Sequence, residues 1–168
     1  MKLPSLLLVA LALLTAAACT PKVRHSTDLE RKKAANLASE AQFAITLRDF
    51  ARAEPLLDQT TQLCPDVADG WLQLGAIRVK LGDKAKARVA YEGALKAVRA
   101  AYAEDAKQFA PRLQEVYVLA LLGRVDDARD ALAKAQKALP DNGQIRGFIE
   151  HKQLDTILAD PNFKELAL

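Results

Sequence analysis

Apolar and small residues recur at helical spacing between residues 68 and 94, and this stretch has the clearest pattern in the chain. Two groups of apolar positions each predict the buried face of a helix, and a glycine between them predicts the end of the first helix. The positions are Trp71, Leu74, Gly75, Gly82, Ala87, Tyr91 and Ala94. Because Gly75 and Ala87 are small where two helices would touch, the stretch predicts an antiparallel helix pair.

The same pattern recurs on either side of this pair, and a proline marks the end of each outer copy because proline cannot continue a helix. These prolines are Pro65 and Pro140. Counting back from them starts units at Ala34 and Phe109, while the middle unit starts at Ala68. Matching positions are Leu37, Ala41, Ala53 and Leu57 in the first unit and Gly123, Ala128, Leu132 and Ala135 in the third. The predicted helix pairs span 34–67, 68–108 and 109–142.

The middle unit carries seven extra residues before the third unit begins. Seven residues make about two turns of helix, so an insertion of this length can extend a helix without rotating its apolar face. We therefore expect one long helix from Lys84 to about Lys107. Pro55 lies inside another predicted helix, where it should remove a backbone hydrogen bond and bend the helix.

This spacing resembles the tetratricopeptide repeat, a helix-turn-helix unit of 34 residues. The resemblance covers residues 34–142 and is strongest in the middle unit. It implies an all-α fold in which antiparallel helix-turn-helix repeats stack as a short right-handed superhelix. The sequence departs from the repeat pattern at Arg78, Arg99, Arg112 and Glu115, where tyrosine, a closing proline or apolar residues are usual. A generic helical bundle is the alternative, although a bundle does not need glycines and prolines in register.

Residues 143–168 predict a capping segment, because the outer face of a short repeat stack needs cover. Apolar residues that could supply this cover are Ile145, Phe148, Ile149, Leu154, Ile157, Leu158, Phe163 and Leu166. The run Asp160-Pro161-Asn162-Phe163 also resembles the ending of many tetratricopeptide arrays. We expect a capping helix here.

The amino terminus predicts an export signal. Lys2 precedes an apolar run from Leu6 to Leu14, which is shorter than the roughly 20 residues of a membrane-spanning helix. Small residues then lead to Cys19, and this order resembles the lipobox of bacterial lipoproteins, in which the signal (residues 1–18) is removed and the cysteine is acylated. Ala16 stands where the lipobox prefers leucine, so ordinary cleavage after Ala18 stays open.

Acylation of Cys19 would anchor the protein on a membrane, since each buried methylene contributes about 0.8 kcal/mol. Residues 19–33 then hold the anchor, a polar leader and the start of the first helix. Thr20 after the cysteine resembles the outer-membrane class of lipoproteins, so we expect a protein that faces the periplasm. A leader over residues 20–28 would extend about 30 Å. Ordinary cleavage would instead give a soluble periplasmic or secreted protein.

Charge and composition argue against several functions. Removal of Lys2 with the signal leaves 23 basic and 21 acidic residues, so the mature chain is nearly neutral and we expect no nucleic-acid binding. The two histidines, His25 and His151, and the few serines have no triad-like or metal-binding spacing, and we expect no catalysis, metal or cofactor. The alternative is an envelope hydrolase or redox protein that uses His151 or Cys64, which requires acidic or hydroxyl neighbours in a cleft.

Protein binding is the function that the resemblance implies, on the concave face lined by the first helix of each unit. The candidate partner-binding residues are Gln42, Ile45, Asp69, Leu72, Ala76, Val79, Lys80, Leu113, Tyr117 and Leu121. Some family members hold a terminal carboxylate with polar residues at the fifth position of the repeat. Here those positions are Ala38, Leu72 and Leu113, so we expect an apolar or amphipathic partner segment with Tyr117 as an anchor. The terminal segments of the chain could instead cover this face.

Together these features predict a non-enzymatic scaffold or adaptor of the bacterial cell envelope, anchored through Cys19 and active in the assembly of an envelope complex. A pilotin-like helper of an outer-membrane machine, an adaptor of cell-wall enzymes and a subunit of a larger complex fit equally well. The sequence does not indicate an oligomeric state.

Overall fold

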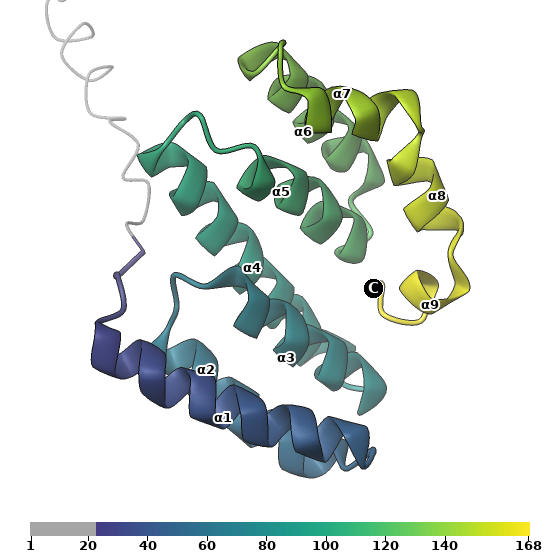
Figure 1. Cartoon of the computed structure of the whole chain (residues 1–168). Helices are drawn as coiled ribbons and strands as arrows, with labels where there is room; N and C mark the ends of the chain where they lie inside the picture. The colour runs from purple at the N-terminus through teal and green to yellow at the C-terminus, as the bar shows by residue number, and fades with distance from the viewer. Residues whose placement is uncertain (1–22) are drawn as a thin grey trace, which may run out of the picture.

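The computed structural model describes residues 23–168, and this part of the chain is helical and contains no strand (Figure 1). The helices are α1 (Asp28–Thr46), α2 (Phe50–Leu63), α3 (Ala68–Lys80), α4 (Lys84–Glu104), α5 (Ala110–Leu121), α6 (Val125–Ala138), α7 (Gly143–Glu150), α8 (Gln153–Ala159) and α9 (Pro161–Lys164). The predicted signal segment and Cys19 lie outside the described residues.

The first six helices form three antiparallel pairs, α1 with α2, α3 with α4 and α5 with α6. Successive pairs pack through α2 on α3 and α4 on α5, so the pairs stack one after another along the molecule (Figure 1). The predicted all-α fold of repeated helix pairs is confirmed. The second helices begin at Phe50, Lys84 and Val125, that is, 34 and then 41 residues apart.

The seven-residue insertion lengthens α4, as predicted. This helix has 21 residues, whereas α2 and α6 have 14 each. It ends at Glu104, three residues before the expected end. The structure also shows α2 as one helix that continues through Pro55.

Small residues allow the helices of each pair to approach closely. Ala53, Ala87 and Ala128 occupy the same position on the three second helices, and each is fully buried. At Gly75 a Cβ atom would lie only 2.2 Å from Cε1 of Tyr91, so only glycine fits between α3 and α4. The predicted role of small residues at this contact is confirmed.

The turn inside each helix pair uses a left-handed residue. Gly82 and Gly123 have φ angles of +81° and +74°, a conformation that glycine adopts without a steric penalty. In the first pair, Arg48 takes the same place with a φ of +57°. The three turns therefore share one geometry although only two contain glycine.

Residues 143–168 cap the third helix pair with three short helices. Asn142 caps α7, and Asp160 caps α9 by accepting a hydrogen bond from the Asn162 N–H. Leu154 and Phe163 are buried in the same apolar cluster as α4 and α5. A C-terminal cap was expected, but it is divided because Lys152 adopts a left-handed backbone and Pro161 starts a new helix.

The predicted polar leader ends earlier than expected. Val23 is buried, and Arg24 Nη2 donates a hydrogen bond to the Leu63 carbonyl at 3.1 Å. Ser26 Oγ lies 2.7 Å from Asp66 Oδ1, and this bond, its backbone counterpart and the nearby Arg31 lower the pKa of Asp66 although burial alone would raise it. Residues from Val23 onward are thus fixed on the α2–α3 turn and are not part of a free spacer.

Candidate functional site

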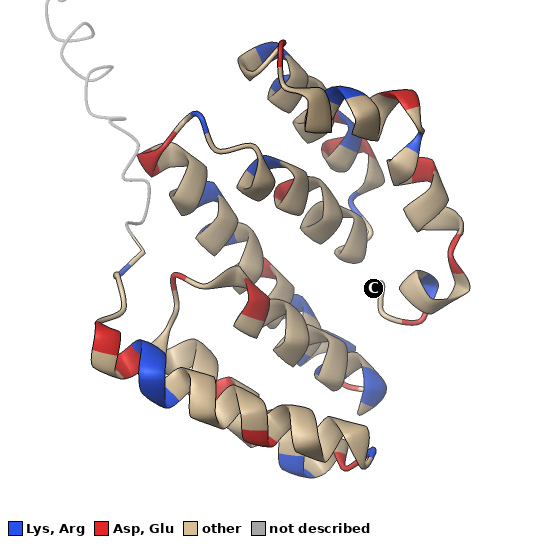
Figure 2. Cartoon of the chain, in the orientation of Figure 1, with Lys and Arg blue, Asp and Glu red and all other residues tan. Residues whose placement is uncertain are grey.

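The first helices of the three pairs, α1, α3 and α5, lie on one side of the stack, with α2, α4 and α6 behind them (Figure 1). We call this side the first-helix face. It divides into an open part between α1 and α3 and a part near α5 that the C-terminal residues occupy. Basic and acidic residues are interspersed along the helices in this view (Figure 2).

The open part contains a pocket of about 270 Å³, here called the α1–α3 pocket. Three alanines of α1, Ala34, Ala35 and Ala38, line one wall, and Asp69, Gly70 and Gln73 of α3 line the other. The floor is formed by Leu57 and Thr60 of α2 and by Cys64, which directly follows this helix.

The pocket exists because alanines of α1 face Gly70 of α3. Leu57 is fully buried and Cys64 is nearly so, which gives the pocket an apolar floor. The Thr60 hydroxyl donates its hydrogen bond to the Leu56 carbonyl within α2 at 2.9 Å. The pocket therefore offers mainly apolar surface, and its polar lining groups include the Asp69 carboxylate, the Gln73 amide and the Arg31 guanidinium, which pairs with Asp66 at 2.7 Å.

The other part of the first-helix face holds the end of the chain itself. The Phe163 ring packs edge-on against Tyr117 with 5.5 Å between ring centroids. The Leu168 N–H donates to the Leu121 carbonyl at 2.9 Å, and the Tyr91 hydroxyl donates to the Leu166 carbonyl at the same distance. We call residues 161–168 the C-terminal segment.

Charge and burial support this docking. Lys80 Nζ lies 2.6 Å from Glu165 Oε2 at the surface, and this contact lowers the pKa of Glu165. Burial raises the pKa of the Tyr91 hydroxyl, and burial followed by the nearby Asp160 raises that of Tyr117. Both phenols therefore remain neutral, and Tyr91 acts as a hydrogen-bond donor.

The predicted partner-binding residues fall into three groups. Gln42 is exposed on α1, Ile45 packs against the core between the first two pairs, and Asp69 lines the α1–α3 pocket and accepts a hydrogen bond from Gln114. Ala76 and Leu113 are half-buried. Of the others, Leu72, Val79 and Tyr117 pack against the apolar cluster that contains Phe163, Lys80 pairs with Glu165, and Leu121 accepts a hydrogen bond from Leu168.

Two expectations need correction. Leu121 was expected to be exposed to a partner, but only 3% of its surface is accessible because, at the end of α5, it belongs to the apolar cluster that contains Phe163. Leu72, Val79 and Tyr117 are only half-exposed, because they pack against the apolar cluster that contains Phe163. Sequence reasoning named Ala38 only as a missing polar contact and missed Ala34 and Ala35 as pocket walls.

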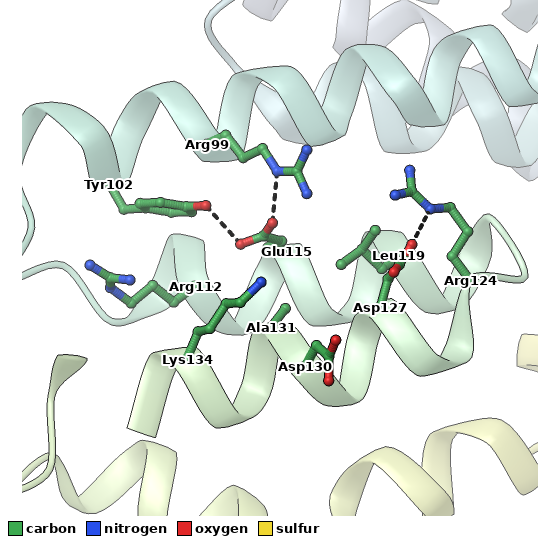
Figure 3. A pocket seen from close by; sticks show the side chains of 10 residues that line it. All are labelled: Arg99, Tyr102, Arg112, Glu115, Leu119, Arg124, Asp127, Asp130, Ala131 and Lys134. Atoms are coloured by element: carbon green, nitrogen blue, oxygen red, sulfur yellow. Dashed lines mark hydrogen bonds and ion pairs between the residues drawn. The ribbon is translucent and has the colours of Figure 1, made fainter. Parts of the chain in front are cut away.

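A second cavity lies between α4, α5 and α6 and has a volume of about 400 Å³ (Figure 3). We call it the polar cleft. Its lining residues are Arg99, Tyr102, Arg112, Glu115, Leu119, Arg124, Asp127, Asp130, Ala131 and Lys134. Three of the departures from the repeat pattern, Arg99, Arg112 and Glu115, meet here. Those departures were visible in the sequence, but their convergence was not.

The residues of the alternative enzyme hypothesis lie apart from each other. His151 is exposed at the end of α7, and the described residues form no hydrogen bond or ion pair with its side chain. Cys64 is 4% exposed and sits on the floor of the α1–α3 pocket. No group of three or more potential metal ligands occurs between residues 23 and 168. His151 lines neither of the two cavities, whereas the pocket that contains Cys64 is also lined by Thr60 and Asp69.

No protein family matches the sequence, and no curated protein matches it. Among solved structures, the chain is similar to SycD, a type III secretion translocator chaperone of Yersinia enterocolitica. The two share 19% identity with a TM-score of 0.46, over 76% of this chain and 89% of SycD. Within the described part, no helix is both long and apolar enough to cross a membrane.

Proposed function

We propose that this protein is a non-enzymatic adaptor that binds an apolar or amphipathic segment of a partner protein in the α1–α3 pocket. The observation that carries the proposal is that one part of the first-helix face is occupied by the chain itself and another part is open. Near α5 this face holds a short segment of its own chain through apolar side chains, backbone hydrogen bonds and one surface ion pair. Between α1 and α3 a pocket of similar apolar character is open.

The occupied part indicates the chemistry of a partner. The C-terminal segment combines a one-turn helix with aromatic and aliphatic anchors, Phe163 and Leu166, and places a carboxylate beside a lysine. A partner segment with one or two apolar anchors and polar flanks would use the α1–α3 pocket in the same way, with Gln73 at the rim as a hydrogen-bonding group.

We further propose that this adaptor works in a bacterial envelope as a lipoprotein anchored through Cys19, in a pilotin-like role or as an adaptor of cell-wall enzymes. The export-signal pattern and the position of Cys19 support this part of the proposal. Because the fold begins at Val23, four residue steps separate it from Cys19, a distance of at most about 14 Å. The helix stack would therefore work close to the membrane, not 30 Å away.

Site-specific photocrosslinking tests the binding site. The crosslinker p-benzoylphenylalanine is placed in the full chain at Ala35, which lines the pocket, or at Asn36, an exposed neighbour that does not line it. We expect one discrete adduct from cells for the Ala35 form and none for the Asn36 form, and peptide mapping should find an apolar partner segment in the adduct. Equal crosslinking at the two positions contradicts the pocket as the binding site.

Blocking the pocket gives an independent measurement. The Ala35→Trp variant should fill the pocket and reduce recovery of the crosslinked partner from a second site such as Gln73, whereas Asn36→Trp should leave recovery unchanged. Mass analysis of the mature N-terminus tests the anchor, because acylated Cys19 and an unmodified residue differ in mass. An unmodified start would end the lipoprotein proposal and leave the binding proposal intact.

A further inference from the structure

The polar cleft contains a buried carboxylate at a position where the repeat pattern predicts an apolar residue. Glu115 is 8% exposed, and its two oxygens accept hydrogen bonds from Arg99 Nε at 2.7 Å and from the Tyr102 hydroxyl at 2.9 Å. Burial and then this bond to Glu115 raise the pKa of Tyr102, which keeps the phenol a donor. This network closes the extended part of α4 onto α5 (Figure 3).

Two other cations of the cleft, Arg112 and Lys134, form no ion pair with the described residues, although Arg112 Nη2 donates a hydrogen bond to the Ala106 carbonyl at 3.3 Å. Arg112 stacks over the Tyr102 ring with 4.7 Å from its guanidinium carbon to the ring centroid, and within residues 23–168 its Nε atom is buried without a hydrogen-bond partner. Lys134 extends from α6 toward Glu115 (Figure 3). Both cations line the part of the cleft that contains Tyr102.

The opposite part of the cleft is acidic. Arg124 pairs there with Asp127 at 2.6 Å and with Glu92 at 3.7 Å, and Asp130 contributes a carboxylate that pairs with no basic group of the described residues. A ligand with several negative charges would be repelled by these groups. One carboxylate near Arg112 and Lys134 would not. Leu119 and Ala131 line the cleft between the two parts, and because Leu119 is only 1% exposed, Ala131 provides the apolar surface that a ligand can reach.

We propose that the polar cleft is a second binding site, which takes a single acidic side chain, next to an apolar residue, from a protein segment. Arg112 and Lys134 hold the carboxylate, and Ala131 contacts the apolar neighbour. This site is formed by α4, α5 and α6 and is separate from the α1–α3 pocket, so it does not depend on the function proposed above. It would let one chain hold two segments at once.

A nuclear magnetic resonance titration of the full mature chain tests the site. The probe is the peptide acetyl-Leu-Glu-Ala-amide, and its matched control is acetyl-Leu-Gln-Ala-amide. We expect the glutamate peptide to shift the amide signals of Arg112 and Lys134 saturably. The glutamine peptide should bind about tenfold more weakly, the change expected for loss of one charge-assisted hydrogen bond.

Charge reversal supplies the matched variants. Lys134→Glu should weaken binding of the glutamate peptide by at least about tenfold, whereas Lys137→Glu, an exposed site on α6 that does not line the cleft, should bind as wild type does. Equal binding of the two peptides, no effect of Lys134→Glu, or shifts outside the cleft would overturn the proposal. Tighter binding of inorganic phosphate than of the glutamate peptide, measured by displacement of the peptide, would also overturn it, because the cleft would then be a general anion site.

Discussion

The contact between Gly75 and Tyr91 sets how closely α3 approaches α4. A Cβ at residue 75 would lie 2.2 Å and 2.4 Å from two ring carbons of Tyr91, and this ring is fully buried. A rigid ring enclosed on all sides cannot move away cheaply, so the Gly75→Ala variant must separate the two helices. We expect its free energy of unfolding to fall by about 1–3 kcal/mol, as measured by urea denaturation.

Gly147 provides a control, because alanine at this position should raise the free energy of unfolding. It lies inside α7, and a Cβ there would meet nothing within 4 Å. The Gly147→Ala variant should therefore gain about 0.5–1 kcal/mol from helix propensity. If Gly75→Ala proves as stable as wild type, the inference that α3 and α4 are too close to admit a Cβ at residue 75 is wrong.

The backbone of Arg48 is strained, whereas the glycines at the same place in the other two turns are not. Its φ of +57° brings the Cβ of an L-residue close to the backbone, whereas Gly82 and Gly123 have no Cβ. Its exposed side chain takes no part in a hydrogen bond or ion pair of the described residues. The Arg48→Gly variant should raise the free energy of unfolding by about 0.5–1 kcal/mol after the entropy cost of glycine is included.

Thermal denaturation checks this expectation, with Gln59→Gly as the matched control. Gln59 is exposed in the interior of α2, where glycine should cost about 1 kcal/mol. The two glycine substitutions should thus move the melting temperature in opposite directions. A fall in both variants would show that the turn at Arg48 is not strained.

At the scale of single helices, α1 begins with a reciprocal cap that makes Glu30 a pH-sensitive group. The Glu30 carboxylate accepts hydrogen bonds from the Thr27 N–H at 2.8 Å and from Arg24, and these bonds lower the pKa of Glu30 to about 2. Since the folded-state pKa is below the ordinary value of 4.5, the stabilisation is present above pH 4.5 and is lost as the pH falls toward 2.

Titration of the Glu30 side-chain carbon by nuclear magnetic resonance should show this low pKa directly. The Thr27→Ala variant removes the hydroxyl cap of α1, so it should move the Glu30 pKa upward and cost about 1 kcal/mol of stability. Thr46→Ala, at the other end of α1, should leave the Glu30 pKa unchanged. An unchanged Glu30 pKa in Thr27→Ala would contradict the reciprocal cap.

The helices themselves could be predicted from the sequence because their signals are local. Turn glycines, small contact residues and the two-turn insertion each act within one helix pair, and all three were identified correctly. The turn at Arg48 was not recognised, since a non-glycine residue in a left-handed turn has no sequence signature. The division of the cap also escaped prediction, because it depends on the backbone of Lys152.

The candidate sites were less predictable because they depend on contacts between distant residues. Repeat positions place Asp69 on the first-helix face, and they left open whether a terminal segment covers that face. They could not show that residues 161–168 return to α3 and α5, as in the pair Lys80 and Glu165, 85 residues apart. Likewise, Arg99 and Glu115 were noted separately as departures from the repeat pattern. Their pairing depends on how far the extended α4 reaches over α5.

At the scale of the whole molecule, the C-terminal segment decides how much of the first-helix face is open. Phe163 is 6% exposed and packs on Tyr117, whereas Lys80 and Glu165 meet at the surface. Burial of an aromatic ring contributes far more than an exposed ion pair, which is generally worth less than about 1 kcal/mol. The segment is therefore held mainly by its apolar anchors.

Phe163→Ala should consequently release the segment, and Lys80→Ala should not. We expect a loss of about 3 kcal/mol of stability for Phe163→Ala. The amide of Leu168 is a specific reporter, because it donates to the Leu121 carbonyl at 2.9 Å only while the segment is docked. Its hydrogen exchange should accelerate strongly in Phe163→Ala and little in Lys80→Ala. Protection of Leu168 that persists in Phe163→Ala would mean that backbone bonds alone hold the segment, and that the face near α5 is closed to any partner with apolar anchors.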